Sequence, residues 1–214
     1  MHPALAKGKE WVGQWAGTTI VCIASGPSLT SEDAETVRQS GLTTIVTNTT
    51  FRMCPWAHVL LAHDAKWWKE YRGEVDEVFT GKRLTCSPSV GPGVLSLRLV
   101  LTFKAFQNSG CAAISLAVLG KAERVVLLGY DAKPANDGRI HWHGDHPETL
   151  SNARTMDKWP RKFEQVAAYA RQHKVPVLNA SRDTALTCFP RVELDEAIRT
   201  NQVENPVQQL ECLT

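Results

Sequence analysis

The 214-residue sequence has no long hydrophobic run, and no segment of it approaches the length of a membrane span. The first residues include Lys7, Lys9 and Glu10 and contain no apolar core segment, which argues against a secretory signal peptide. The six cysteines fall singly, with no C-x-x-C pair, so the spacing excludes a zinc ribbon and a thioredoxin-like site. These absences predict a reduced, cytoplasmic protein without a membrane span.

The sequence also lacks an excess of charge of either sign. Its 24 Lys and Arg residues nearly balance 22 Asp and Glu residues, and the formal net charge is +2. This balance gives no electrostatic case for a nucleic-acid surface. There is no internal repeat, low-complexity tract or linker, and the length suits one domain better than two. We therefore predict a single domain over residues 1–214.

Short apolar runs alternate with helical segments along the chain. A run of this kind without polar interruption is typical of a strand that is buried on both faces of a parallel sheet. The alternation predicts a single Rossmann-like, doubly wound, mostly parallel sheet with helices on both faces. The core would span about 18–190, after a lead-in helix over 1–17 that carries Trp11 and Trp15 one turn apart, and before a tail at 200–214. The expected strands are 19–24, 43–47, 58–62, 125–128 and 175–179, with less clear ones at 78–80 and 83–86, and the expected helices are 30–40, 109–119, 157–173 and 194–199.

Polar residues follow several of these strands at the point where each strand ends. In an open parallel sheet, ligands bind at the carboxyl ends of the strands. Each polar residue alone is also an ordinary turn former, but five strand ends together favour a binding site. The residues in question are Ser25 to Ser28, Asn48, His63 with Asp64, Tyr130 with Asp131, and Asn179.

The segment Gly26-Pro27-Ser28-Leu29 is predicted to hold a phosphorylated, nucleotide-like ligand. Glycine lets backbone approach a ligand closely, proline fixes φ for the turn, and a helix N-terminus offers free N–H groups to phosphate. A second helix start at Asn108-Ser109-Gly110 has the same geometry, although a plain N-cap would look alike. The sequence contains neither G-x-G-x-x-G nor G-x-x-x-x-G-K-[ST], so the common NAD and P-loop motifs are excluded.

The loop His141-Trp142-His143-Gly144-Asp145-His146 allows three interpretations. One histidine could serve as a general base, the role suited to its titration near neutral pH. His141 and His143 would point the same way on an extended segment and, with His146 or Asp145, could ligate a metal. The third interpretation is a solvated polar loop. Asp64 and Asp131, each directly after a buried strand, are candidate Mg²⁺ ligands beside phosphates.

The ordered set of motifs resembles the bacterial sialyltransferases of glycosyltransferase family 42. The motifs are an apolar strand leading into G-P-S-L, an Asn that ends the second strand, N-S-G at a helix start, L-G-Y-D, and a His before the last long helix. The sequence is also similar to motility-associated glycosyltransferases and to hydroxymethyl-dihydropterin pyrophosphokinases. Its N-S-G and H-W-H-G-D-H motifs further resemble phage-encoded members of that group. The resemblance covers roughly residues 19–190.

The resemblance implies a role for each matching position. Gly26 and Ser28 would lie against the phosphate and ribose, Asn48 near the phosphate, and Ser109 with Gly110 against the sugar or base. His146, with His143 as the alternative, would take the proton of the acceptor. The predicted nucleotide-binding set is Ser25, Gly26, Pro27, Ser28, Asn48, Asn108, Ser109, Gly110 and Lys133, the predicted catalytic set is His146, His143 and Asp131, and the candidate metal ligands are Asp64, Asp131 and His141.

Two departures from the sialyltransferase pattern matter. Ser25 stands where those enzymes have an Asn, and Ala132 and Lys133 follow Asp131 where they use tyrosines to receive the leaving phosphate. Cations such as Lys133 could do that work electrostatically.

We therefore expect a transferase that uses a nucleotide-activated donor, a CMP-sugar or another nucleotide, with a histidine general base. The alternatives are Mg²⁺-dependent diphosphate transfer of the pyrophosphokinase type and a non-catalytic nucleotide-binding accessory protein of a phage, placed in the host cytoplasm. The acceptor is left open, and a homo-oligomer is compatible with the resemblance.

Overall fold

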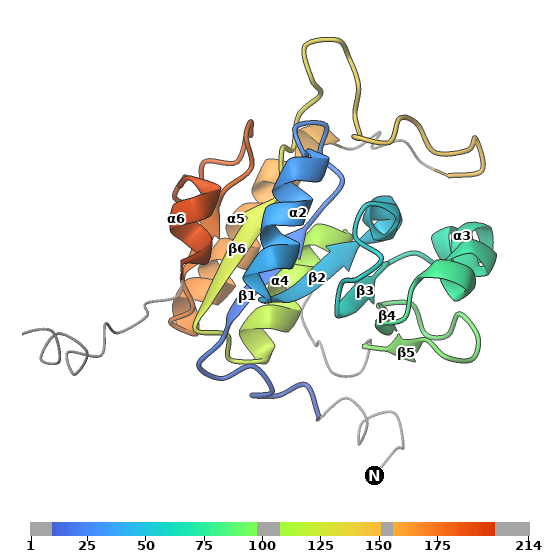
Figure 1. Cartoon of the computed structure of the whole chain (residues 1–214), viewed down its shortest axis with the longest axis horizontal. Helices are drawn as coiled ribbons and strands as arrows, with labels where there is room; N and C mark the ends of the chain where they lie inside the picture. Colours follow the sequence, from blue (N-terminus) through green and yellow to red (C-terminus); the bar gives the residue numbers. More distant parts are fainter. Residues whose placement is uncertain (1–9, 98–107, 151–155, 200–214) are drawn as a thin grey trace, which may run out of the picture.

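The computed structural model of the chain describes residues 10–97, 108–150 and 156–199. It contains a sheet of seven parallel strands in the order β5-β4-β3-β2-β1-β6-β7, which confirms the predicted Rossmann-like α/β fold (Figure 1). The elements, in chain order, are β1 (Thr19–Ile23), α2 (Ser31–Ser40), β2 (Thr43–Thr47), the 3₁₀ helix η1 (Asn48–Arg52), β3 (Val59–Leu61), α3 (Ala65–Val78), β4 (Lys82–Thr85), β5 (Leu95–Ser96), α4 (Ser109–Leu119), β6 (Arg124–Leu128), the 3₁₀ helix η2 (Met156–Lys158), α5 (Trp159–Gln172), β7 (Val177–Asn179) and α6 (Leu194–Ile198).

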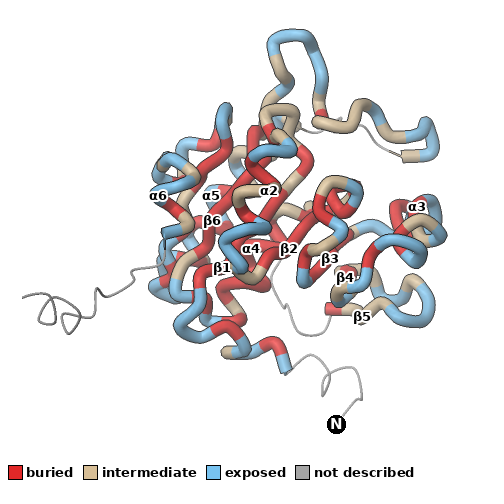
Figure 2. The backbone as a smooth tube through the Cα atoms, viewed as in Figure 1, coloured by how far each residue is buried: buried red, intermediate tan, exposed pale blue. Residues whose placement is uncertain are grey.

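Strand β1 lies inside the sheet, between β2 and β6, and is buried along its whole length. Its side chains alternate between two apolar layers, as the two-residue period of a strand requires. Ile20 and Cys22 belong to the layer that packs under α4 and α5, whereas Val21 and Ile23 belong to the layer covered by α2, α3 and α6. Figure 2 shows this buried centre, with α4 also largely buried and exposed residues on the outer sides of α2, α3, α5 and α6. Helices therefore cover both faces of the sheet, as the sequence predicted.

The order of the strands places a topological switch beside β1. The chain builds β1 to β5 outward on one side and then crosses to add β6 and β7 on the other. Strands β1 and β6 pair in register, with Cys22 opposite Leu127. In open α/β sheets, the crevice at such a switch point is the usual ligand position.

Local sequence signals account for the starts of the two helices nearest this switch. Thr30 and Asp33 form a reciprocal capping box at α2, with the Asp33 N–H donating to Thr30 Oγ1 at 3.1 Å. At α4 the Asn108 side chain caps the helix by accepting from the Cys111 N–H at 2.7 Å. Both helix starts were predicted from these residues.

The lead-in prediction is wrong where the structure describes it; residues 1–9 and the tail at 200–214 lie outside the described residues. Residues 10–15 form turns, because Gly13 and Gly17 adopt φ values of 75° and 73°, which an α-helix does not allow. Trp11 and Trp15 nevertheless pack edge to face, with ring centroids 5.5 Å apart, and belong to the buried layer under α4.

Two further differences lie around α3. The predicted strand at 78–80 does not form, because α3 continues to Val78 and buries Trp68, Tyr71 and Val75 on one face. Strand β5, which is only two residues long, was not predicted. Over the described parts of the chain, no helix has the length and apolar character needed to cross a membrane.

Candidate functional site

A small cleft, partly open to solvent, lies at the carboxyl ends of β1, β2 and β6. Helices α4 and α5 complete its walls. It is lined by Ala24, Ser25, Gly26, Pro27, Thr47, Asn48, Asn108, Ser109, Gly110, Gly129, Tyr130, Asp131, Ala132, Lys133, Ile140, His141, Met156, Trp159 and Phe163.

One wall of the cleft is the first turn of α4. The Asn108 carboxamide caps this turn by accepting from the Cys111 N–H. Within the described residues, the N–H groups of Ser109 and Gly110 find no acceptor. The turn has no acidic side chain, and Lys133 also lines the cleft. The positive end of the helix dipole and a nearby ammonium group together suit an anionic ligand.

Another part of the cleft wall is apolar and comes from α5 and neighbouring residues. Met156, Trp159 and Phe163 follow one another at helical spacing and face the cleft with Ile140. The ring of Tyr130 packs edge to face against Phe163, with centroids 5.7 Å apart. Aromatic and apolar surface of this kind accommodates a flat heterocycle.

The Gly26-Pro27-Ser28 turn is filled by Asp131 rather than left open for a ligand. The carboxylate of Asp131 accepts from the Ser28 N–H at 2.7 Å and from Ser28 Oγ at 2.8 Å. A Cβ on Gly26 would lie 2.3 Å from Asp131 Oδ1 and 2.5 Å from the Gly129 carbonyl oxygen. The lack of a Cβ at Gly26 therefore allows the segment that follows β6 to approach the turn closely, and Gly26 also lines the cleft. Ser28 itself does not line the cleft.

Asp131 is nearly buried, with an exposed fraction of 3%. Burial raises the pKa of its carboxyl from 3.8 to about 6, and the two bonds from Ser28 oppose that rise. Lys133 stands close by, although its Nζ pairs with Asp183 at 2.7 Å. Ala132, between them, holds a φ of 51°, an uncommon conformation for a residue other than glycine and one typical of functional loops.

Ser109 and Asn48 tie the walls of the cleft together. Ser109 Oγ donates to Asn48 Oδ1 at 2.8 Å and accepts from the His63 N–H at 3.0 Å. Asn48 takes the left-handed conformation, with φ of 49°, that this side chain tolerates better than most. Both residues were predicted to bind the nucleotide. Both residues line the cleft. The hydroxyl of Ser109 is used in the two hydrogen bonds that hold the start of α4 in place.

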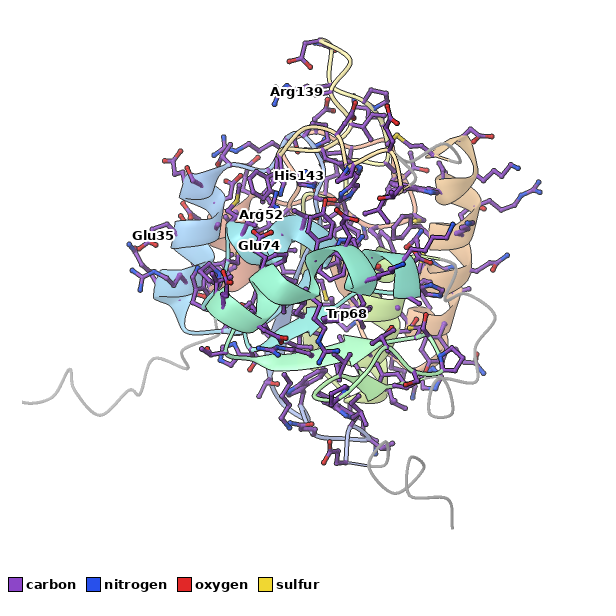
Figure 3. All side chains as sticks on the ribbon, turned by 90° about the vertical axis from the view of Figure 1, so that its right-hand side faces the viewer. Glu35, Arg52, Trp68, Glu74, Arg139 and His143 are labelled. Carbon is purple, nitrogen blue, oxygen red and sulfur yellow. The ribbon has the colours of Figure 1, made fainter. Side chains whose placement is uncertain are left out.

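The histidine loop crosses the edge of the sheet from β6 towards α3. Ser25 anchors its first part, through a 3.2 Å bond between Ser25 Oγ and His141 Nδ1 and a 3.1 Å bond from the Trp142 N–H to the Ser25 carbonyl. His146 Nδ1 bonds to Tyr71 Oη at 2.9 Å and so anchors the second part to α3. Figure 3 shows His143 on the side of the loop towards Arg52 and Glu74, and Arg139 near the outer tip.

The three histidine rings stand close together, with centroids 4.8 to 5.1 Å apart. Burial, reinforced by neighbouring histidines and Arg52, lowers the pKa of His143 to about 3 and that of His146 to about 4. Burial also lowers the pKa of His141 below its usual value of 6.5. All three imidazoles are therefore neutral at pH 7. His141 is buried, whereas His143 and His146 are half-buried.

Asp64 and Asp131 do not share a site. They follow β3 and β6, which are separated by β2 and β1, and three strand spacings of about 4.8 Å place them on the order of 14 Å apart. The Asp64 side chain is 77% exposed, beside His63. In residues 10–97, 108–150 and 156–199, no group of three His, Cys, Asp or Glu side chains is placed to hold a metal ion. The predicted Asp64–Asp131 pair is therefore wrong, because its members stand on non-adjacent strands.

Two buried polar atoms that belong to the lining of the cleft find no hydrogen-bond partner in the described structure. They are Asn108 Nδ2 and His141 Nε2. Leaving a buried polar group unpaired costs about 1–3 kcal/mol, so such groups in a cleft indicate the place of a ligand.

The structure brings most of the predicted nucleotide-binding residues into one cleft. Ser25, Gly26, Pro27, Asn48, Asn108, Ser109, Gly110, Asp131, Lys133 and His141 line it, whereas Ser28, Asp64, His143 and His146 do not. The apolar wall of Ile140, Met156, Trp159 and Phe163 was missed, although the spacing of the last three residues is a helical signal in the sequence.

No protein-family model and no curated protein matches the sequence. Among solved structures, the chain is similar to the crystal structure of UDP-glucose 4-epimerase from Brucella ovis in complex with NAD, with a TM-score of 0.32 and 11% sequence identity. The alignment covers 77% of this chain and 51% of that chain, so this chain spans about half the length of the epimerase. A likeness this distant carries no functional argument.

Proposed function

We propose that this chain is a transferase that binds a nucleotide-activated donor in the cleft and moves a glycosyl group to an acceptor hydroxyl by single displacement. The observation that carries the proposal is the pairing of two unlike walls in one cleft. The first turn of α4 and Lys133 offer N–H groups and positive charge, and Ile140, Met156 and Trp159 offer an apolar surface. A nucleoside phosphate combines a flat base, which suits the apolar surface, with an anionic group, which suits the N–H groups and the positive charge.

The reaction needs a place for the charge that develops on the leaving phosphate. As the acceptor oxygen forms its bond to the sugar carbon, the bond from that carbon to the phosphate oxygen breaks, and the nucleotide leaves with the bonding electron pair. The N–H groups of Ser109 and Gly110 are positioned to stabilise that oxygen, with Lys133 as the nearby cation. Fixed donors of this kind act more strongly in a water-poor cleft than in bulk water.

The resemblance to sialyltransferases adds the expectation of a CMP-sugar donor, and the departures at Ser25 and Lys133 leave other nucleotides open. The alternative of diphosphate transfer depended on Asp64 and Asp131 acting together, and their separation across the sheet gives it no support.

The test is thermal unfolding with CMP, UDP, GDP and ADP, and with the corresponding nucleotide sugars, each with and without Mg²⁺. A nucleotide at about 100 times its Kd stabilises the folded chain by about 2.7 kcal/mol. We expect one nucleotide to raise the melting temperature and its sugar derivative to release free nucleotide slowly by hydrolysis.

A matched pair of variants tests whether the nucleotide binds in the cleft. Lys133→Ala should weaken the stabilisation by the nucleotide, whereas Lys69→Ala, on the exposed face of α3, should leave it unchanged. No shift with any nucleotide overturns the proposal. Stabilisation without release of nucleotide from any donor sugar identifies a non-catalytic binding module instead.

A further inference from the structure

His141 differs from the other two histidines of the loop in how its ring is held. Its residue is 7% exposed, and its Nδ1 bonds to Ser25 Oγ at 3.2 Å. Its Nε2 is buried and finds no partner within the described residues. Both His141 and Ser25 belong to the lining of the cleft, so a buried nitrogen without a partner belongs to a residue that borders the candidate site.

The other two histidines are placed elsewhere. His146, the residue that the resemblance favours as general base, is held at Nδ1 by Tyr71 and does not line the cleft. His143 does not line it either, and its ring stands between Trp142 and the other two imidazoles. Of the three histidines in the loop, His141 lines the cleft, and the two that follow do not.

We propose that His141 is the general base of the transfer and that Ser25 is the positioning residue that fixes its tautomer. This inference rests on the proposed function. In the proposed tautomer His141 Nδ1 donates to Ser25 Oγ, which leaves the lone pair of the neutral imidazole on Nε2. The opposite tautomer, in which Ser25 Oγ donates to Nδ1, is the alternative that the experiment must exclude.

The proton balance of the step follows from this arrangement. The acceptor hydroxyl gives its proton to His141 Nε2 while its oxygen forms the bond to the sugar carbon and the phosphate oxygen departs with the electron pair. The resulting imidazolium keeps its Nδ1–H on Ser25 and returns the extra proton to water after the products leave. Burial lowers the pKa of His141, so the ring is regenerated as the free base at neutral pH.

Charged and titratable groups surround this ring from several elements. His143, His146 and Asp145 come from its own loop, and Asp131 and Lys133, which line the same cleft, follow β6. Arg52, from η1, acts on His143 and His146. Asp145 favours the charged ring, and the two other histidines, when protonated, oppose it. A pH profile alone would therefore mix several titrations, and the decisive readout is the tautomer of the ring.

The first experiment is ¹⁵N NMR of the histidine rings in the full chain, with the His141 signals assigned by comparison with His141→Asn. We expect Nδ1 protonated and Nε2 bare in the wild type at pH 7.5. Ser25→Ala should produce a mixture of tautomers, and Ser25→Thr, which keeps a hydroxyl, should restore the single form. A protonated Nε2 in the wild type overturns the proposal, even if no donor sugar is turned over.

The second experiment measures nucleotide release from the donor that stabilises the wild type. His141→Asn keeps a nitrogen near the Nδ1 position, so it should retain nucleotide binding within about twofold while release falls by about 100-fold or more. His173→Asn, at the exposed end of α5, should match the wild type.

The outcomes separate this inference from the proposed function. A loss of release in His146→Asn that equals or exceeds the loss in His141→Asn assigns the base to His146 and overturns the inference, with the transferase intact. Absence of stabilisation of the wild type by any nucleotide overturns the proposed function, whatever the tautomer of His141.

Discussion

At the scale of single residues, Gly26 has a packing role that its sequence motif did not reveal. The glycine in this turn predicts that another group lies close to its backbone. In the structure the closest groups are the Asp131 carboxylate and the Gly129 carbonyl. The sequence could not show this, because the two segments lie about a hundred positions apart and meet only through the pairing of β1 with β6.

We predict that Gly26→Ala lowers the free energy of unfolding by about 3 kcal/mol, the upper end for overpacking, because the backbone of Gly129 cannot move aside as a flexible side chain can. Gly73→Ala is the matched control: it lies inside α3 with open space around the new methyl group. It should stabilise the chain by about 0.5–1 kcal/mol through helix propensity. Urea unfolding of both variants checks the pair, and equal effects would contradict the role given to Gly26.

At the scale of elements, the loop from Ala132 to Leu150 has no regular structure, and a few side-chain bonds hold it over the edge of the sheet. Ser25 and Tyr71 anchor it at two points, through His141 and His146. Its histidines stay neutral inside the folded chain and are free to protonate once it unfolds.

The loop therefore predicts acid sensitivity. The folded-state pKa values of His143 and His146, about 3 and about 4, lie below the unfolded value of 6.5. Their contribution to stability is complete above pH 6.5 and is lost as the pH falls towards 4, by up to about 1.4 kcal/mol per pH unit for each ring. Asp131 acts in the opposite sense, because its raised pKa gives stability that is lost as the pH rises from 3.8 through about 6.

Comparison with a His143→Gln/His146→Gln double variant isolates the histidine contribution, since Asp131 is common to both proteins. We expect the stability of the wild type relative to this variant to decline between pH 6.5 and pH 4.5 in urea unfolding experiments. A pH-independent difference would show that the two rings are not held neutral.

The elements themselves were largely predictable, and the contacts among them were not. β1, β2 and β6 read as short apolar runs, and Thr30 and Asn108 marked helix starts through local capping. In contrast, the apolar wall supplied by Trp159 and Phe163 depends on how α5 packs beside α4, which no local pattern records. The separation of Asp64 from Asp131 likewise depends on strand order, which an alternating sequence does not specify.

At the scale of the whole molecule, the packed domain begins before β1. Trp11 is 1% exposed and lies with Trp15 in the layer under α4, where a Cβ on Gly120 would meet the Trp15 ring at 2.4 Å. The segment before the first strand is therefore part of the core on this face, although it forms no helix where it is described.

We predict that Trp11→Ala lowers the free energy of unfolding by about 3–5 kcal/mol, the range for removal of a buried aromatic side chain. Val12→Ala, at the neighbouring residue with a 52% exposed side chain, should change it by less than about 0.5 kcal/mol. Urea unfolding followed by circular dichroism measures both. Similar values for the two variants would place Trp11 outside the cooperative unit.

The chain crosses from one side of β1 to the other, and this order determines the point during synthesis at which the cleft can form. During synthesis, β1 to β5 emerge first and can form one half of the sheet, but β6 and the cleft-lining part of α5 follow only after residue 123. Until β6 has left the ribosome, the nascent chain exposes the unpaired edge of β1. Until Phe163 follows, the chain holds no complete cleft. A ligand of the cleft can therefore stabilise only the finished chain and cannot act as a template for its first half.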